Sequence, residues 1–180
     1  MSLRRYSTWH GVFMEIMGTG VLLCGASGIG KGELALELIT RGHRLVADDA
    51  PEFRVGDTAV IAGACPPLLQ DRLEVRGLGV LDVRALFGEK AIALSSTLAL
   101  SIRLQRATPG AQHSLAPDYR ECRVLDHTLP EIVLPLLPGR NVALLVETLV
   151  RDFRLRRAGY AAAEDFAQRQ SASLRRVGEA

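Results

Sequence analysis

The stretch Val21-Leu-Leu-Cys-Gly-Ala-Ser-Gly-Ile-Gly-Lys31 decides the fold, because an apolar run breaks there into a glycine-rich turn and a helix-forming segment follows. Glycines tolerate positive φ angles and carry no Cβ, so backbone N–H groups can turn inward around an anion. The charge of Lys31 and the dipole of the following helix favour the same anion. The spacing predicts a phosphate-binding loop formed by Gly25, Ala26, Ser27, Gly28, Ile29, Gly30, Lys31 and Gly32.

The composition is that of one globular domain. The chain has 180 residues, of which 48% are apolar and 23% charged, and its net charge is +2. Such a small charge and 5% aromatic residues do not indicate a nucleic-acid or membrane partner. Three widely spaced cysteines favour reduced thiols in the cytoplasm, and no apolar run is long enough to span a membrane. We expect a domain over residues 9–170, between a flexible lead-in (1–8) and a C-terminal tail (171–180).

The remaining patterns predict a mixed α/β fold. The expected strands and helices are a hairpin (11–17 with 21–24), a helix (33–40), a strand (44–47), a second hairpin (52–55 with 59–62), strand-like runs (91–104), an edge strand bounded by prolines (130–135), a helix (142–153) with Asn141 as N-cap, and a short helix (161–170). The segment 106–126 has little periodicity, so it is expected to be a lid or disordered.

Several charged residues are candidates for chemistry. Asp48 and Asp49 end the strand 44–47, where adjacent carboxylates indicate metal binding or proton transfer, the alternative being a solvated turn. Glu74 and Arg76 precede a glycine-rich turn and form either a ligand site or a surface ion pair. Arg140 precedes the helix 142–153 and either holds an anion or is a solvated surface residue.

Five ordered motifs closely resemble the catalytic domain of HPr kinase/phosphorylase. They are His10-Gly-Val12, the loop Gly25–Lys31, Arg41-Gly-His-Arg-Leu-Val-Ala-Asp-Asp49, Leu73-Glu-Val-Arg-Gly-Leu-Gly79 and Pro138-Gly-Arg-Asn141. The resemblance covers residues 9–166 and is most specific at Leu73–Gly79. It implies an α/β P-loop kinase fold of the HPr kinase and phosphoenolpyruvate carboxykinase type, with a mixed sheet and C-terminal helices.

The resemblance also implies an activity and roles for residues. The family phosphorylates a serine of the phosphocarrier protein HPr with ATP or pyrophosphate, removes that phosphate by phosphorolysis, and assembles as a hexamer. By position, Asp49 would transfer the proton with support from His10 and Asp48. Lys31 would stabilise the transferred phosphoryl group, and Glu74, with Asp49, would bind Mg²⁺. Arg76 lies in the family signature and is expected to be catalytic.

Three features depart from the family pattern. The family's amino-terminal domain is absent from this sequence, Gly32 replaces the serine whose hydroxyl binds Mg²⁺, and Leu115 aligns where the family has a catalytic arginine. The loss of a hydroxyl predicts that Gly32→Ser would tighten Mg²⁺-dependent nucleotide binding. Two functions therefore remain open: an HPr-type serine kinase/phosphorylase, and a catalytically attenuated protein that senses phosphate or nucleotide, or binds a partner, on the same fold.

Overall fold

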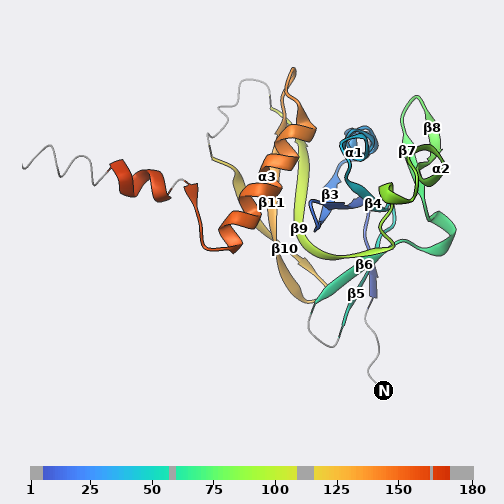
Figure 1. Cartoon of the computed structure of the whole chain (residues 1–180), viewed down its shortest axis with the longest axis horizontal. Helices are drawn as coiled ribbons and strands as arrows, with labels where there is room; N and C mark the ends of the chain where they lie inside the picture. Colours follow the sequence, from blue (N-terminus) through green and yellow to red (C-terminus); the bar gives the residue numbers. More distant parts are fainter. Residues whose placement is uncertain (1–5, 57–59, 109–115, 163, 171–180) are drawn as a thin grey trace, which may run out of the picture. The chain divides into compact units, whose positions relative to one another are not determined.

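Strand β3 (Thr19–Gly25) occupies the centre of a nine-stranded mixed sheet in the computed structural model. It pairs antiparallel with β2 (Val12–Ile16) and parallel with β9 (Ser95–Arg106), and β4 (Arg44–Ala47) continues the sheet beyond β2. The structure describes residues 6–56, 60–108, 116–162 and 164–170. Because six of the seven residues of β3 are buried, the glycine-rich loop at its end leaves a strand that is held on both edges (Figure 1).

Beyond β9 the sheet continues in two directions. The first part of β9 pairs with β6 (Ile61–Ala64), which pairs with β5 (Glu52–Val55) and, through β5, with β1 (Tyr6–Thr8). This arrangement confirms the second predicted hairpin, but its second strand is Ile61–Ala64 where 59–62 was predicted, and Ala59 lies outside the described residues. Tyr6–Thr8 had been expected in the flexible lead-in, and pairing with β5 gives this segment a defined place.

The later part of β9 pairs in parallel with β11 (His127–Leu136), which pairs antiparallel with β10 (Asp118–Val124). The prediction that 130–135 is an edge strand is therefore wrong, because β10 covers the outer edge of β11. Pro130 has a partner only on β10 and Pro135 only on β9, so each proline removes one N–H donor from one ladder, while residues 131–133 pair with both strands. The prediction of a lid or disordered segment over 106–126 is wrong for β10, and residues 109–115 lie outside the described part of the chain.

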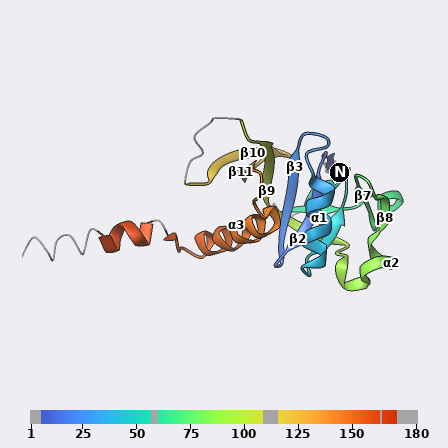
Figure 2. The same ribbon diagram turned by 90° about the horizontal axis from the view of Figure 1, so that it is seen from above.

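Helix α1 (Lys31–Thr40) follows the glycine-rich loop and packs against one face of β2, β3 and β4 (Figure 2). Its buried residues Leu34, Ala35, Leu38 and Ile39 fall at helical spacing, as predicted. Beside α1, β7 (Arg72–Val75) and β8 (Gly79–Asp82) form a separate two-stranded hairpin. Short helical segments flank it: η1 (Pro67–Leu69), α2 (Val83–Phe87) and η2 (Glu89–Ala91).

The chain divides into two compact units, Met1–Ala143 and Leu144–Ala180. Helix α3 (Val142–Arg157) buries Ala143, Val146, Val150 and Phe153 at intervals of three and four residues, which confirms the predicted helix. Residues 162 and 164–170 are also helical. Among the described residues, no helix has the length and apolar character needed to span a membrane. The predicted tail, residues 171–180, lies outside the described part of the chain.

A glycine on β6 makes room for an aromatic contact in the core. Phe13 and Phe53 meet edge to face, with ring centroids 5.1 Å apart. A Cβ at Gly63 would lie 2.5 Å from an edge carbon of each ring. Gly63→Ala is therefore expected to lower the free energy of unfolding by about 1–3 kcal/mol, because two fully buried rings must move.

Urea denaturation measures this effect, and Gly56→Ala provides the control. A Cβ at Gly56 meets only the Val60 carbonyl oxygen, at 3.9 Å. The control should change the free energy of unfolding by less than about 0.5 kcal/mol. Equal losses in the two variants would contradict the packing argument.

Candidate functional site

The glycine-rich loop has a conformation that only glycine adopts without strain at several positions. Gly25, Gly28 and Gly30 have φ angles of 143°, 71° and 103°. Gly30 is the N-cap of α1, and its carbonyl accepts the first helical hydrogen bond from the Leu34 amide at 3.0 Å. The lysine at the start of α1 turns back over the loop: Lys31 Nζ donates to the carbonyl oxygens of Gly25 at 3.1 Å and Ala26 at 3.2 Å.

A hydrogen-bonded chain connects this lysine to a carboxylate. His10 Nδ1 lies 2.8 Å from Asp49 Oδ1, and His10 Nε2 lies 3.5 Å from Lys31 Nζ. In the tautomer whose Nδ1–H donates to Asp49, Nε2 keeps a lone pair that accepts from the ammonium group. The side chains of His10 and Asp49 are 58% and 70% exposed, so both can contact a ligand. The structure thus brings together the three residues expected to carry proton and charge transfer.

The two adjacent aspartates occupy different environments. Asp48 is half-buried, and its Oδ2 accepts the backbone N–H of Glu74 at 2.7 Å. Burial raises the pKa of the Asp48 carboxyl above its ordinary value, while the hydrogen bond from the Glu74 amide acts in the opposite direction. Asp49 has a left-handed backbone with φ 65° and lies in solvent. Asp48 is thus engaged in holding β7, and Asp49 is the more accessible carboxylate.

An open cavity of about 180 Å³ joins these elements. Its lining includes the predicted site residues His10, Ser27, Gly28, Gly30, Lys31, Gly32, Asp48, Asp49, Glu74 and Arg76, together with Glu33. Arg76 reaches the loop directly, since a Cβ at Gly28 would lie 2.6 Å from its Nη2 atom. Of the predicted binding residues, Arg140 is exposed on the turn before α3 and is absent from this lining, as are Gly25, Ala26 and Ile29.

The carboxylates of the cavity fit a magnesium ion that is bound together with phosphate. Mg²⁺ typically takes one or two protein carboxylates and completes its shell with phosphate oxygens and water. Asp49 and Glu74, the two predicted ligands, line the same cavity. Among the described residues, no group of three or more His, Cys, Asp or Glu side chains is arranged to hold a metal. The two cavity carboxylates match the number that Mg²⁺ usually takes from a protein when phosphate is bound.

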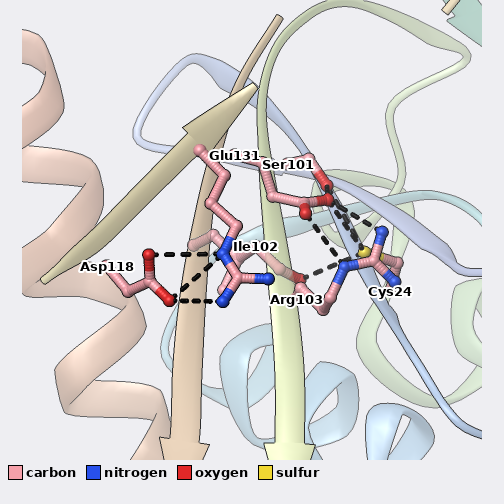
Figure 3. Close-up of polar contacts among 7 residues, drawn as sticks. Cys24, Ser101, Ile102, Arg103, Asp118 and Glu131 are labelled. Atoms are coloured by element: carbon pink, nitrogen blue, oxygen red, sulfur yellow. Dashed lines mark hydrogen bonds and ion pairs between the residues drawn. The ribbon is translucent and has the colours of Figure 1, made fainter. Parts of the chain in front are cut away.

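A buried polar cluster behind the loop was not predicted from the sequence (Figure 3). Arg103 makes a two-point contact with Glu131, with Nε to Oε1 at 2.9 Å and Nη2 to Oε2 at 3.0 Å. Ser101 Oγ donates to Glu131 Oε2 at 3.2 Å and lies 3.4 Å from Cys24 Sγ. Cys24 directly precedes Gly25, so this cluster anchors the strand end from which the glycine-rich loop leaves.

A charged residue in an apolar strand was the only available signal for this cluster. Glu131 stands in the run Pro130–Pro135, and Ser101 and Arg103 stand at alternate positions of β9. Alternation puts Ser101 and Arg103 on one face, but only the register of β9 with β11 places Ser101 beside Glu131. Burial raises the pKa of the Cys24 thiol, which keeps it protonated.

The fold and the cavity define an α/β protein whose central strand leads through a glycine-rich loop into a helix, with acidic residues, His10 and Lys31 around the loop. A family model described as HPr Serine kinase C-terminal domain matches residues 1–170. The chain therefore belongs to this family.

Individual relatives agree with the family match. The chain is 51% identical over 173 residues to proteins named HPr kinase/phosphorylase from Xanthomonas campestris pv. campestris (strain B100) and Xanthomonas oryzae pv. oryzae (strain PXO99A), covering 94% of this chain and 55% of each relative. The chain thus spans about half the length of these curated relatives. The solved structure of the HPr(Ser) kinase/phosphatase from Coxiella burnetii superimposes with a TM-score of 0.79 at 40% identity, covering 89% of this chain and 98% of that one. These matches confirm the expected P-loop kinase-like fold.

Asp48 makes the stability of the protein depend on pH. Because its pKa is raised in the folded protein, the folded state binds a proton more tightly than the unfolded state does. Stability contributed by this group is present below the ordinary pKa of 3.8 and is lost as pH rises through the folded pKa. Asp48→Asn keeps an acceptor for the Glu74 amide but does not titrate. The free energy of unfolding of the variant relative to wild type should therefore increase as pH rises through this window.

Urea denaturation at a series of pH values, in buffer with a chelator, measures this difference. A relative stability that falls as pH rises would contradict the assignment of a buried, raised-pKa carboxyl to Asp48.

The buried cluster predicts unequal effects for two arginines. Arg103→Ala leaves the buried Glu131 carboxylate without its counter-charge, so the free energy of unfolding should fall by about 2–3 kcal/mol. Arg169→Ala is the control, because Arg169 pairs with Asp165 one helical turn away and its side chain is 77% exposed, so the unfolding midpoint should stay unchanged. Thermal and urea denaturation compare the two variants. Similar midpoints in both would show that Glu131 does not depend on Arg103.

Proposed function

We propose that the chain is the catalytic domain of an ATP- or pyrophosphate-dependent serine kinase that acts on the phosphocarrier protein HPr and removes the phosphate from phosphoserine-HPr by phosphorolysis. The observation that carries the proposal is the chain of contacts from Lys31 through His10 to Asp49 at the glycine-rich loop. In this chain of contacts, Lys31 supplies a positive charge that can bind a phosphate, and Asp49 supplies a carboxylate that can accept the proton of a hydroxyl group. The names of the 51%-identical relatives support HPr as the protein substrate.

In the kinase direction, the serine oxygen attacks the terminal phosphorus of the donor while Asp49 accepts the hydroxyl proton. The bond from phosphorus to the bridging oxygen breaks, and the diphosphate or phosphate product leaves with the bond's electron pair. Lys31 and the loop amides stabilise the negative charge on the phosphoryl oxygens. His10 orients Asp49 through its Nδ1–H, and Arg76 lies near enough to the loop to contact the same phosphate.

In the reverse direction, inorganic phosphate attacks the phosphorus of phosphoserine. Asp49, now protonated, returns its proton to the serine oxygen as the bond between that oxygen and phosphorus breaks, and pyrophosphate is formed. One carboxyl group serves both directions because the proton that it takes is the one that it gives back. This double role suits the exposed position of Asp49, while Asp48 keeps its contact with β7.

Mg²⁺ would be held by Glu74 and Asp49 and would neutralise charge on the donor phosphates when bound. Gly25 to Gly32 would surround these phosphates, with Arg140 as a further predicted anion contact. A homohexamer and a cytoplasmic location remain part of the proposal. Reduced thiols support the location, since Cys24, Cys65 and Cys122 are all free.

Asp49→Asn is expected to lower phosphoryl transfer to HPr, and phosphorolysis of phosphoserine-HPr, by about 10²–10⁴-fold, because an amide cannot exchange this proton. Nucleotide affinity measured without Mg²⁺ should stay within about twofold, since the direct phosphate contacts are those of the loop and Lys31. Transfer is measured with labelled ATP or pyrophosphate and Mg²⁺, and affinity by calorimetry.

Lys31→Ala sets the background of this assay, because it removes the cation that contacts the phosphate. Wild-type protein that binds nucleotide but forms no phosphoserine above this background would overturn the proposed activity and favour the sensing or partner-binding alternative. Full activity of Asp49→Asn in either direction would remove Asp49 from the role of base.

A further inference from the structure

The hairpin β7–β8 approaches the start of α1 more closely than any residue with a side chain would allow. A Cβ at Gly32 would lie 2.1 Å from the Glu74 carbonyl oxygen, 3.2 Å from the Glu74 carbonyl carbon and 3.5 Å from Val75 Cα. Real Cβ atoms essentially never come within 3.0 Å of a non-bonded heavy atom. The neighbouring atom here belongs to the backbone, which cannot change conformation as easily as the end of a flexible side chain. The absence of a side chain at position 32 is therefore what permits this contact.

Two further contacts hold the same three-residue segment. The Glu74 amide donates to Asp48 Oδ2 at 2.7 Å. Arg76 lies over Gly28, where a Cβ would be 2.6 Å from Nη2 and 3.3 Å from Cζ. Successive parts of the segment Glu74–Arg76 thus rest on the end of β4, on the first turn of α1 and on the glycine-rich loop. All three lie at the cavity.

The hairpin is a separate structural piece whose internal contacts do not fix this position. It forms its own two-stranded sheet beside α1, apart from the nine-stranded sheet (Figures 1 and 2). Its base is closed by the hydrogen bond from the Val83 amide to the Asp71 carbonyl and by ion pairs of Arg72 with Asp82 and of Arg84 with Asp71. A shift of the hairpin as a unit would keep these contacts and would displace Glu74 and Arg76 together.

We infer that Gly32 is a positioning residue that seats β7 on the first turn of α1 and thereby sets how closely Glu74 and Arg76 approach the glycine-rich loop. The inference rests on the proposed function only in taking the cavity as a phosphate site. It gives Gly32 a role in this chain that is different from a lost metal ligand: the space that a Cβ would need is occupied by the hairpin that carries Glu74 and Arg76 to the loop.

The two explanations of Gly32 make opposite predictions for one pair of variants. If the lost hydroxyl weakens the site, Gly32→Ser tightens Mg²⁺-dependent binding and Gly32→Ala does not. If seating of β7 is the role of Gly32, both variants weaken binding, because both add the Cβ that meets the Glu74 carbonyl. Gly56→Ala is the matched control, since a Cβ there meets only the Val60 carbonyl oxygen, at 3.9 Å.

The test uses the full chain with pyrophosphate and Mg²⁺ as the probe. Amide hydrogen exchange followed by NMR reports the seating directly, because the Glu74 amide is protected by its bond to Asp48. Gly32→Ala and Gly32→Ser should each raise the exchange rate of this amide by about tenfold or more, and weaken pyrophosphate binding by about tenfold. Amides of β3 and β9 should keep wild-type protection, and Gly56→Ala should change neither quantity.

Three results would overturn the inference: wild-type exchange at Glu74 in Gly32→Ala, tighter pyrophosphate binding in Gly32→Ser, or loss of protection throughout the core. A Gly32→Ala protein that does not fold belongs with the third result, because displacement of a separate hairpin must leave the central sheet intact. Neither readout requires HPr. If the two Gly32 variants show these exchange and binding effects but the wild-type protein transfers no phosphate to HPr, the proposed function is contradicted. The seating role of Gly32 is then still supported.

Discussion

The rest of the site depends on the position of β3, which the backbone of β9 approaches closely at both ends of the strand. A Cβ at Gly20 would lie 2.1 Å from the Thr97 carbonyl oxygen, and one at Gly25 would lie 2.6 Å from that of Leu104. Side chains at these positions would push β3 away from β9. Because the glycines permit close pairing, the loop begins from a strand that is paired with β9 along its length, and the Gly25 carbonyl at its end accepts a hydrogen bond from Lys31 Nζ.

Burial separates the roles of charges that are adjacent in sequence. Asp48 faces inward far enough to accept a backbone amide of β7, and desolvation raises its pKa. Asp49, one residue later, turns into solvent because its backbone adopts a left-handed conformation that Asp tolerates better than most residues. The turn after β4 thus supplies two carboxylates with different roles: Asp48 holds β7, and Asp49 is exposed in the cavity. The buried Glu131 is a third case, since its charge is neutralised by Arg103 and supports the strand that leads into the loop.

Local sequence patterns predicted the helices and strands near the loop well. The predictions failed for features that depend on pairing between strands far apart in the sequence. The hairpin of β2 with β3 and the strand Arg44–Ala47 follow from apolar runs bounded by glycines and charges. Strand β10 was missed because its seven residues DYRECRV are mostly polar and exposed, and only its pairing with β11 makes them a strand. The same pairing moved Pro130 and Pro135 from an expected edge to an inner strand. The cavity could be predicted because its residues lie in short contiguous motifs, whereas the Glu131 cluster depends on the register of three strands.

Position 32 shows why a motif cannot be judged residue by residue. Within the loop, glycine in place of a hydroxyl residue is only a loss, because a ligand oxygen disappears. The role of Gly32 becomes clear only from Glu74, whose carbonyl oxygen occupies the space that a Cβ at position 32 would need. Gly28 repeats this relation with Arg76, so two glycines of the loop face two successive charged residues of one hairpin. The loop and the hairpin are therefore complementary in shape, and a change in either one alters how far Glu74 and Arg76 lie from the glycine-rich loop.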